Sequence, residues 1–299
     1  MIKIEYSTMC FSLTDYKDKI IEAKKYVESK GFKFGVQLHN SITAELYNKL
    51  LAFKNEINFT IHSPLFTRYM LNLAGKNFDI IHNEIKNTVK YLETFNTNIF
   101  FFHGFFMTDK PIENNMHNYK KMLTDSIPGE YRIGNSIVMN PKFLDTPKFQ
   151  EYKNTFKINY KKLKSLYPEL IVTIENDYPG IGSGFQRIND IKECIDNLWF
   201  DIGHLWCSSI LHEFDFYKAA DELISDMNII GVHLNHNLTP QNAPKDQIYD
   251  SHTHLYAETE QNLKPVIKNL LKKRVEIFTL EIRDGDIEDV KILIDWLQN

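Results

Sequence analysis

Eight short apolar runs, rich in β-branched and aromatic residues, recur along the chain and constrain its fold more than any other feature. Most of the runs are continuous rather than alternating, which is typical of strands covered on both faces. The runs therefore predict eight buried strands. They occupy residues 2–7, 32–39, 57–62, 98–103, 170–175, 198–201, 229–234 and 275–281.

Segments with a helical spacing of apolar residues lie between these runs. In FDIIHNEIKNTVKYLETF, for example, Ile81, Ile85 and Val89 fall on one helical face. Ser41 is the expected N-cap of the second helix, with Glu45 close to the capping-box position. The helices are expected within residues 14–31, 41–55, 78–95, 149–166, 186–197, 214–226, 259–273 and 286–298.

Strand and helix thus alternate eight times over 299 residues, which is the pattern of an α/β fold of the (β/α)8 TIM barrel type. A doubly wound open sheet shares the same alternation, but the count of eight favours the barrel. No internal repeat and no linker divides the sequence. We therefore expect residues 1–299 to form a single barrel domain.

The spacing between the fourth and fifth strands is irregular. After one helix is allowed for, a surplus remains at residues 104–148, which contain Pro111, Pro128 and Pro141 and scattered aromatic residues. Because this segment follows a strand, it should lie at the carboxyl end of the barrel, where catalytic residues lie in such folds. We expect a loop insertion over the catalytic face, since long loops there often have a function. A disordered insertion is the alternative.

Composition limits the class of protein. The formal net charge of −4 gives no global excess of positive charge for coating nucleic acid, although it leaves room for a local basic groove. Cys10, Cys194 and Cys207 are widely spaced and form no CxxC pair, which suits a reducing compartment. The sequence shows no signal-peptide pattern and no apolar run long enough to span a bilayer. We expect a cytoplasmic protein with no membrane span and no obligatory protein partner.

Histidines and acids gather where the predicted strands end. The carboxyl ends of barrel strands converge on one opening, so these side chains should face the same small volume. The set comprises His62, His103, Glu175, Asp201, His204, His233, Asp250, His252 and Glu281.

So many acids cannot share a site as bare anions without large pKa shifts or a bound cation. Mixed nitrogen and oxygen ligands are typical of Zn²⁺, Mn²⁺ or Fe²⁺. A single ion takes about four protein ligands, so a set of this size indicates more than one ion. His39 ends the second strand and is kept as a possible substrate contact. Any one of these histidines alone would more often be a hydrogen-bonded structural residue.

Short motifs surround the same residues. They are His62-Ser63-Pro64 followed by Asn72-Leu73-Ala74, His103-Gly104, Glu175-Asn176 followed by Gly180-Ile181-Gly182-Ser183, Asp201-Ile202-Gly203-His204, His233-Leu234-Asn235, Asp250-Ser251-His252 and Glu281. Together they resemble the motifs of endonuclease IV, the zinc-dependent apurinic/apyrimidinic endonucleases within the xylose isomerase-like TIM barrel superfamily. The resemblance extends from the third predicted strand to the eighth.

The resemblance implies a metal-dependent phosphodiester hydrolase that cleaves DNA at apurinic/apyrimidinic sites, with damaged DNA as its partner. It implies up to three zinc ions, with manganese or iron as other metals. Glu175 is then a bridging metal ligand and the catalytic residue that orients the attacking hydroxide. The glycine turn lets backbone approach the site closely. Arg68 and Tyr69 are the expected substrate contacts, through phosphate contact and base stacking.

Departures from the family pattern bear on the substrate. His236 stands where the family has an acid, and residues 104–148 have no family counterpart. The alternative is a single-metal sugar (phosphate) isomerase or epimerase of the same superfamily, which uses only part of the ligand set: Glu175, Asp201, His233 and Glu281 around one ion, with His204 contacting the substrate. Its two glutamates would move protons on either side of a sugar carbon. A barrel that only binds a ligand is a third reading.

Overall fold

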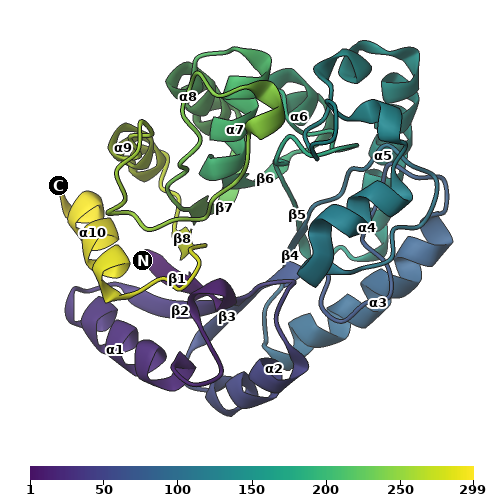
Figure 1. Ribbon diagram of the computed structural model, residues 1–299. Coiled ribbons are helices and arrows are strands. Elements are labelled where there is room, and N and C mark those ends of the chain that lie inside the picture. Colours follow the sequence, from purple (N-terminus) through teal and green to yellow (C-terminus); the bar gives the residue numbers. More distant parts are fainter.

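The computed structural model describes residues 1–299 and contains a closed barrel of eight parallel strands in the order β1 to β8 (Figure 1). Pairing of β1 with β8, with Lys3 opposite Ile277, closes the barrel and excludes the open sheet. All eight runs predicted as strands are confirmed, with ends that differ by no more than two residues. The strands are β1 (Lys3–Ser7), β2 (Lys33–Leu38), β3 (Asn58–Ser63), β4 (Ile99–Phe102), β5 (Ile171–Glu175), β6 (Asn197–Asp201), β7 (Asn228–Leu234) and β8 (Ile277–Leu280).

Helices surround the barrel, and each predicted helical segment contains one or forms most of one (Figure 1). These helices are α1 (Tyr16–Ser29), α2 (Ala44–Leu50), α3 (Phe78–Thr94), α5 (Pro147–Leu166), α6 (Ile188–Cys194), α8 (Phe216–Asp226), α9 (Lys264–Lys272) and α10 (Ile287–Gln298). Six short 3₁₀ helices accompany them: η1 (Thr8–Cys10), η2 (Leu51–Phe53), η3 (Met116–Asn118), η4 (Gly129–Tyr131), η5 (Pro141–Asp145) and η6 (Lys245–Gln247). None of the helices is long and apolar enough to cross a membrane.

Two helices were not predicted, and one cap was predicted wrongly. Every residue from Ile202 to Leu211 in α7 (Ile202–His212) is buried, so this helix has no polar face to mark its period. The second is α4 (Tyr119–Ser126), within the irregular segment. Thr43, not Ser41, caps α2, because its hydroxyl accepts from the backbone N–H of Leu46.

The barrel interior contains an aromatic stack beneath the carboxyl ends of the strands, beside a buried polar cluster in which the hydroxyls of Thr60 and Thr279 donate to Glu5. Phe101 of β4 and Trp199 of β6 stack with ring centroids 3.9 Å apart. Gly231 of β7 makes room for this stack, because a Cβ at that position would lie 2.5 Å from the Trp199 ring. The imidazole of His233 lies edge-on to both rings. The stacked rings therefore hold the imidazole of His233 against rigid aromatic surfaces.

Residues 104–148 are folded rather than structureless, and they contain α4 together with η3, η4 and η5. Backbone hydrogen bonds join this segment to the glycine turn after β5. The N–H of Met107 donates to the Gly182 carbonyl at 2.8 Å, and the N–H of Ile181 donates to the Ile137 carbonyl at 2.7 Å. The turn is therefore held between the beginning and the end of the 104–148 segment.

The glycines are required by this contact. A Cβ on Gly184 would lie 2.2 Å from the Phe105 ring, and one on Gly182 would lie 2.7 Å from the Ile127 side chain. Gly182 also has a φ of +80°, which favours glycine. The glycine-rich stretch thus seats the 104–148 segment, a use that differs from the backbone approach to the site implied by the resemblance.

Substituting Gly184 with alanine is expected to destabilise the protein. The added methyl group overpacks Phe105, and such overpacking costs about 1–3 kcal/mol. Urea unfolding would measure this change. The double variant Gly184→Ala/Phe105→Leu should recover part of the loss, because leucine leaves space for the methyl group. Equal loss in both variants would contradict the packing explanation.

Candidate metal centre

All nine strand-end histidines and acids converge at the carboxyl end of the barrel. Their ligand atoms form three groups, and within each group these atoms lie within 4.8 Å of one another. Glu175 belongs to two of the groups, so it joins them. Group one is His62, His103 and Glu175; group two is Glu175, Asp201, His233 and Glu281; group three is His204, Asp250 and His252. His39 forms a further such set with His62 of group one and Glu281 of group two.

Group one lies between β3, β4 and β5. Oε2 of Glu175 is 2.9 Å from Nε2 of His62 and 3.4 Å from Nε2 of His103. The other ring nitrogens are held from behind: Nδ1 of His103 is 3.1 Å from Oδ1 of Asp177, and Nδ1 of His62 is 3.2 Å from the Asn40 amide. Both imidazoles therefore present Nε2 to the same carboxylate oxygen, an arrangement found around metal ions.

Group two is the most deeply buried, and its centre is His233. Nε2 of this ring lies 2.9 Å from Oε1 of Gln37, so it donates there. Nδ1 then faces carboxylate oxygens of Glu175 at 2.7 Å, Glu281 at 3.3 Å and Asp201 at 3.4 Å. A nitrogen lone pair facing three carboxylates is repulsive unless a cation or a proton lies among them.

The charges in group two act on its histidine. Burial opposes protonation of His233, but the carboxylates of Glu281 and Glu175 outweigh it and hold the pKa of this imidazole well above its ordinary value. For Glu175, burial acts in the other direction and raises the pKa of the carboxyl group. The surrounding histidines outweigh this effect and hold that pKa well below its usual range. The group therefore demands positive charge next to fully buried carboxylates, which either a proton or a metal ion supplies.

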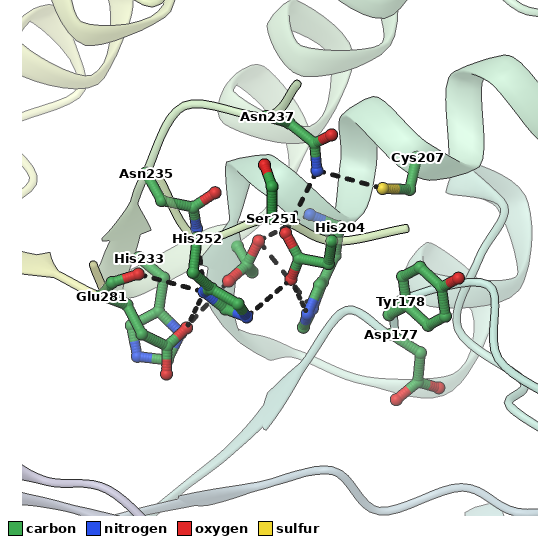
Figure 2. A network of polar contacts seen from close by, with 12 residues as sticks. Asp177, Tyr178, His204, Cys207, His233, Asn235, Asn237, Ser251, His252 and Glu281 are labelled. Atoms are coloured by element: carbon green, nitrogen blue, oxygen red, sulfur yellow. Dashed lines mark hydrogen bonds and ion pairs between the residues drawn. The ribbon is translucent and has the colours of Figure 1, made fainter. Parts of the chain in front are cut away.

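Group three is built on the first turn of α7 and the loop after β7 (Figure 2). Oδ2 of Asp250 lies 3.1 Å from Nε2 of His204 and 2.9 Å from Nε2 of His252. Each ring donates through Nδ1 to a backbone carbonyl, that of Asn176 at 2.9 Å and that of Glu281 at 3.0 Å. Both Nε2 atoms are thereby left as ligands facing one carboxylate.

His252 carries a further sign of functional constraint. Its φ is 45°, a left-handed conformation that is uncommon outside glycine. The backbone N–H of Arg283 donates to the His252 carbonyl at 2.9 Å, which helps to hold this conformation. Burial lowers the pKa of His252, but Asp250 outweighs it and raises that pKa to about 9.

The hydrogen bonding of the carboxylates gives separate support for a metal ion in each of the three groups. One buried carboxylate oxygen in each group has no hydrogen-bond partner: Oε2 of Glu175, Oδ2 of Asp201 and Oδ2 of Asp250. A histidine nitrogen approaches each of these oxygens without the geometry of a hydrogen bond. Uncompensated buried carboxylate oxygens are costly, and coordination to a cation removes that cost. The mixed nitrogen and oxygen donors suit zinc, manganese or iron.

A cavity of about 580 Å³ opens above the three groups. Six of the nine candidate ligands line it, namely His62, His103, His204, Asp250, His252 and Glu281. Glu175, Asp201 and His233 are fully buried and do not border the cavity, so they lie beneath its floor.

The three predicted substrate contacts have different positions. His39 lines the cavity, and its Nε2 lies 3.5 Å from Oε1 of Glu281. Arg68 and Tyr69 do not line the cavity. The exposed guanidinium of Arg68 instead lies over the Tyr69 ring, 5.0 Å from its centroid. The structure therefore brings His39 to the candidate site and leaves the other two outside it.

Most of the residues that hold the ligands in place were not identified from the sequence; Asn176 had been noted only as part of the Glu175-Asn176 motif. Gln37, Asn40 and Asp177 each contact a candidate histidine. Asn176 exchanges two hydrogen bonds with the backbone of Asp201, both at 2.8 Å. Gln37 could have been found, because it is the one amide side chain within the buried run FKFGVQLH. Asp177 could have been found because it follows Glu175 by two residues.

Comparison with known proteins supports the fold. No protein-family model matches the chain, and no curated protein matches it in sequence. Similar solved structures include a D-tagatose 3-epimerase-like protein (TM-score 0.65, 16% identity), the IolI protein with a bound zinc atom (0.57, 10%) and endonuclease IV from Thermus thermophilus (0.53, 13%). Each match covers 100% of this chain and 97%, 95% and 99% of the other, in the same order.

This chain shares the barrel fold of these neighbours. They include both an epimerase-like protein and an endonuclease. At such low identities the likeness establishes the fold alone and favours neither chemistry. The assignment of function therefore depends on the site itself.

Proposed function

We propose that this protein is a metal-dependent phosphoester hydrolase with up to three metal ions, similar in chemistry to endonuclease IV. The observation that carries the proposal is the division of nine ligands into three groups, two of which share Glu175. A single-metal reaction would require only one such group. Further ions would give groups one and three a common reason for their arrangement.

The proposed roles follow from burial and position. Divalent ions held in these groups would polarise phosphoryl oxygens and lower the pKa of a nearby water. Glu175 is fully buried and lies beneath the cavity floor, so we propose that it serves as the shared ligand of groups one and two and orients the attacking water through them. Asp177 and Asn40 hold the rings of His103 and His62, and thereby keep Nε2 of each facing this carboxylate.

Damaged DNA is the substrate that the resemblance suggests, and an abasic-site phosphodiester is the form to test. Arg68 and Tyr69 do not border the cavity, so a role for them requires a substrate that extends beyond it. The single-metal sugar isomerase or epimerase remains the second candidate. It is favoured by the deep burial of group two, which alone supplies four ligands for one ion.

Metal content per chain separates these two proposals. We expect about three ions in protein purified without chelator, because each group supplies three or four ligands. Elemental analysis measures this number. Chelation should abolish hydrolysis of bis-p-nitrophenyl phosphate, and zinc should restore it. One ion per chain, together with epimerisation of ketoses, would instead support the second candidate.

A set of residues outside the metal centre, with the same spacing of ligand atoms, provides the control. His254, Asp286 and Asp289 also lie within ligand distance of one another. Their carboxylates already accept hydrogen bonds from the backbone at the start of α10 and from Leu255, so they are satisfied without an ion. His254→Gln should therefore leave the metal content unchanged.

A further inference from the structure

The cavity above the candidate metal centre has two unlike faces. Histidines and acids form its floor, while the 104–148 segment contributes an apolar and aromatic wall. Phe106, Met116, Tyr119 and Ile137 of that segment border the cavity. Its volume of about 580 Å³ lies within the range of pockets that enclose one small ligand, roughly 300–1,000 Å³.

This wall is fixed to the barrel at two places. The glycine turn holds one side, through the hydrogen bonds to Gly182 and Ile181 described above. On the other side, the buried amide of Asn72 donates to the carbonyls of Phe106 and Thr108, at 3.0 and 2.9 Å, and its oxygen accepts from the Phe106 N–H at 2.9 Å. A wall bonded to both neighbouring loops does not swing aside easily, so it limits what can reach the floor.

The loop after β3 makes a further attachment to the wall, on the same side as Asn72. The N–H of Met70 donates to the Ile112 carbonyl at 2.9 Å, and the N–H of Asn114 donates to the Arg68 carbonyl at 2.9 Å. The loop after β3 is therefore paired with the 104–148 segment. These bonds use the backbone of the loop and leave the Arg68 side chain exposed.

The charge of the cavity also opposes a long polyanion. Among its 22 lining residues, Arg283 is the single Lys or Arg. Outside the metal groups, the acids Asp177 and Asp284 line it as well. Interfaces with DNA are much more positively charged, because each phosphate contact is made largely by Lys or Arg. Beyond the metal groups, this cavity offers almost no site for a second or third phosphate.

We infer that the substrate is a small phosphoester of about the size of one nucleotide, with a planar or apolar group that lies against Tyr119, Phe106 and Ile137. This inference rests on the proposed phosphoester chemistry and narrows its substrate class. The phosphate meets the metal groups at the floor, and the wall excludes the interior of a DNA duplex.

Comparing substrates of different size tests the inference on the full, zinc-loaded chain. The small substrate is the methyl ester of thymidine 5′-monophosphate, whose alkoxide leaving group is comparable to that of DNA, and the large one is a duplex with a central abasic site. We expect kcat/KM for the small ester to exceed that for the duplex by about 100-fold, and an abasic single strand to fall between them. Duplex cleavage as efficient as that of the ester overturns the inference but leaves the hydrolase proposal intact. If the protein hydrolyses no phosphoester, both the inference and the hydrolase proposal are wrong.

A variant in the wall supplies a second readout. Tyr119→Ala should raise KM for the thymidine ester about tenfold with little change in kcat, because the variant removes a ring of the cavity wall but no candidate metal ligand. Tyr119→Phe should retain the original KM. Tyr256 is a half-exposed tyrosine that does not border the cavity, so Tyr256→Ala is the control. An unchanged KM in Tyr119→Ala, with the fold intact by circular dichroism, overturns the inference.

Discussion

Glu175→Gln is expected to reduce phosphoester hydrolysis by on the order of 10³-fold and to lower metal content by about two ions per chain. The carboxylate of Glu175 belongs to groups one and two, with Oε2 facing His62 and Oε1 facing His233. Glutamine has nearly the same shape but no charge, and its amide N–H₂ cannot act as a ligand. Both groups therefore lose a shared anionic ligand at once.

Rates with bis-p-nitrophenyl phosphate and elemental analysis of the same preparation measure the two effects together. Glu84→Gln is the matched control, since Glu84 is also buried but lies on α3 and accepts from the backbone N–H of Arg68 outside the cavity. We expect this control to keep its metal and its activity. A Glu175→Gln protein with full metal content and an unchanged rate would show that this carboxylate bridges nothing.

The strands and the ligand set were accessible from the sequence for the same physical reason. A strand covered on both faces must be continuously apolar, so a polar residue that ends such a run marks the strand end. Glu175 at the end of IVTIE and Asp201 at the end of NLWFD are marked in this way. Because barrel strands all end at one opening, local sequence was sufficient to place distant residues together.

Other features could not be predicted because they depend on contacts distant in sequence. The α7 helix is buried on all sides, so its sequence carries no helical period. The requirement for Gly184 is set by the ring of Phe105, which is far away in the chain. The division of nine ligands into three groups depends on which side-chain atoms face one another, and strand ends alone do not determine that.

Asp250→Asn is expected to remove one ion and to lower phosphoester hydrolysis by about 100-fold. Asp250 is the single carboxylate of group three, and its Oδ2 faces Nε2 of both His204 and His252. Asparagine keeps an oxygen that can accept from the Asn237 amide, which now donates to Oδ1 at 3.1 Å. The surrounding loop should therefore keep its structure while the group loses its charge.

This variant also separates the two candidate chemistries, because group two does not include Asp250. A single-metal isomerase or epimerase would keep its ion and nearly all of its activity after the substitution. Asp246→Asn is the control, since Asp246 is exposed on the same loop and does not border the cavity. Loss of one ion and of hydrolysis in Asp250→Asn, but not in Asp246→Asn, would make group three part of the reaction centre. Unchanged metal content and activity in both variants would reduce the site to group two and favour the single-metal enzyme.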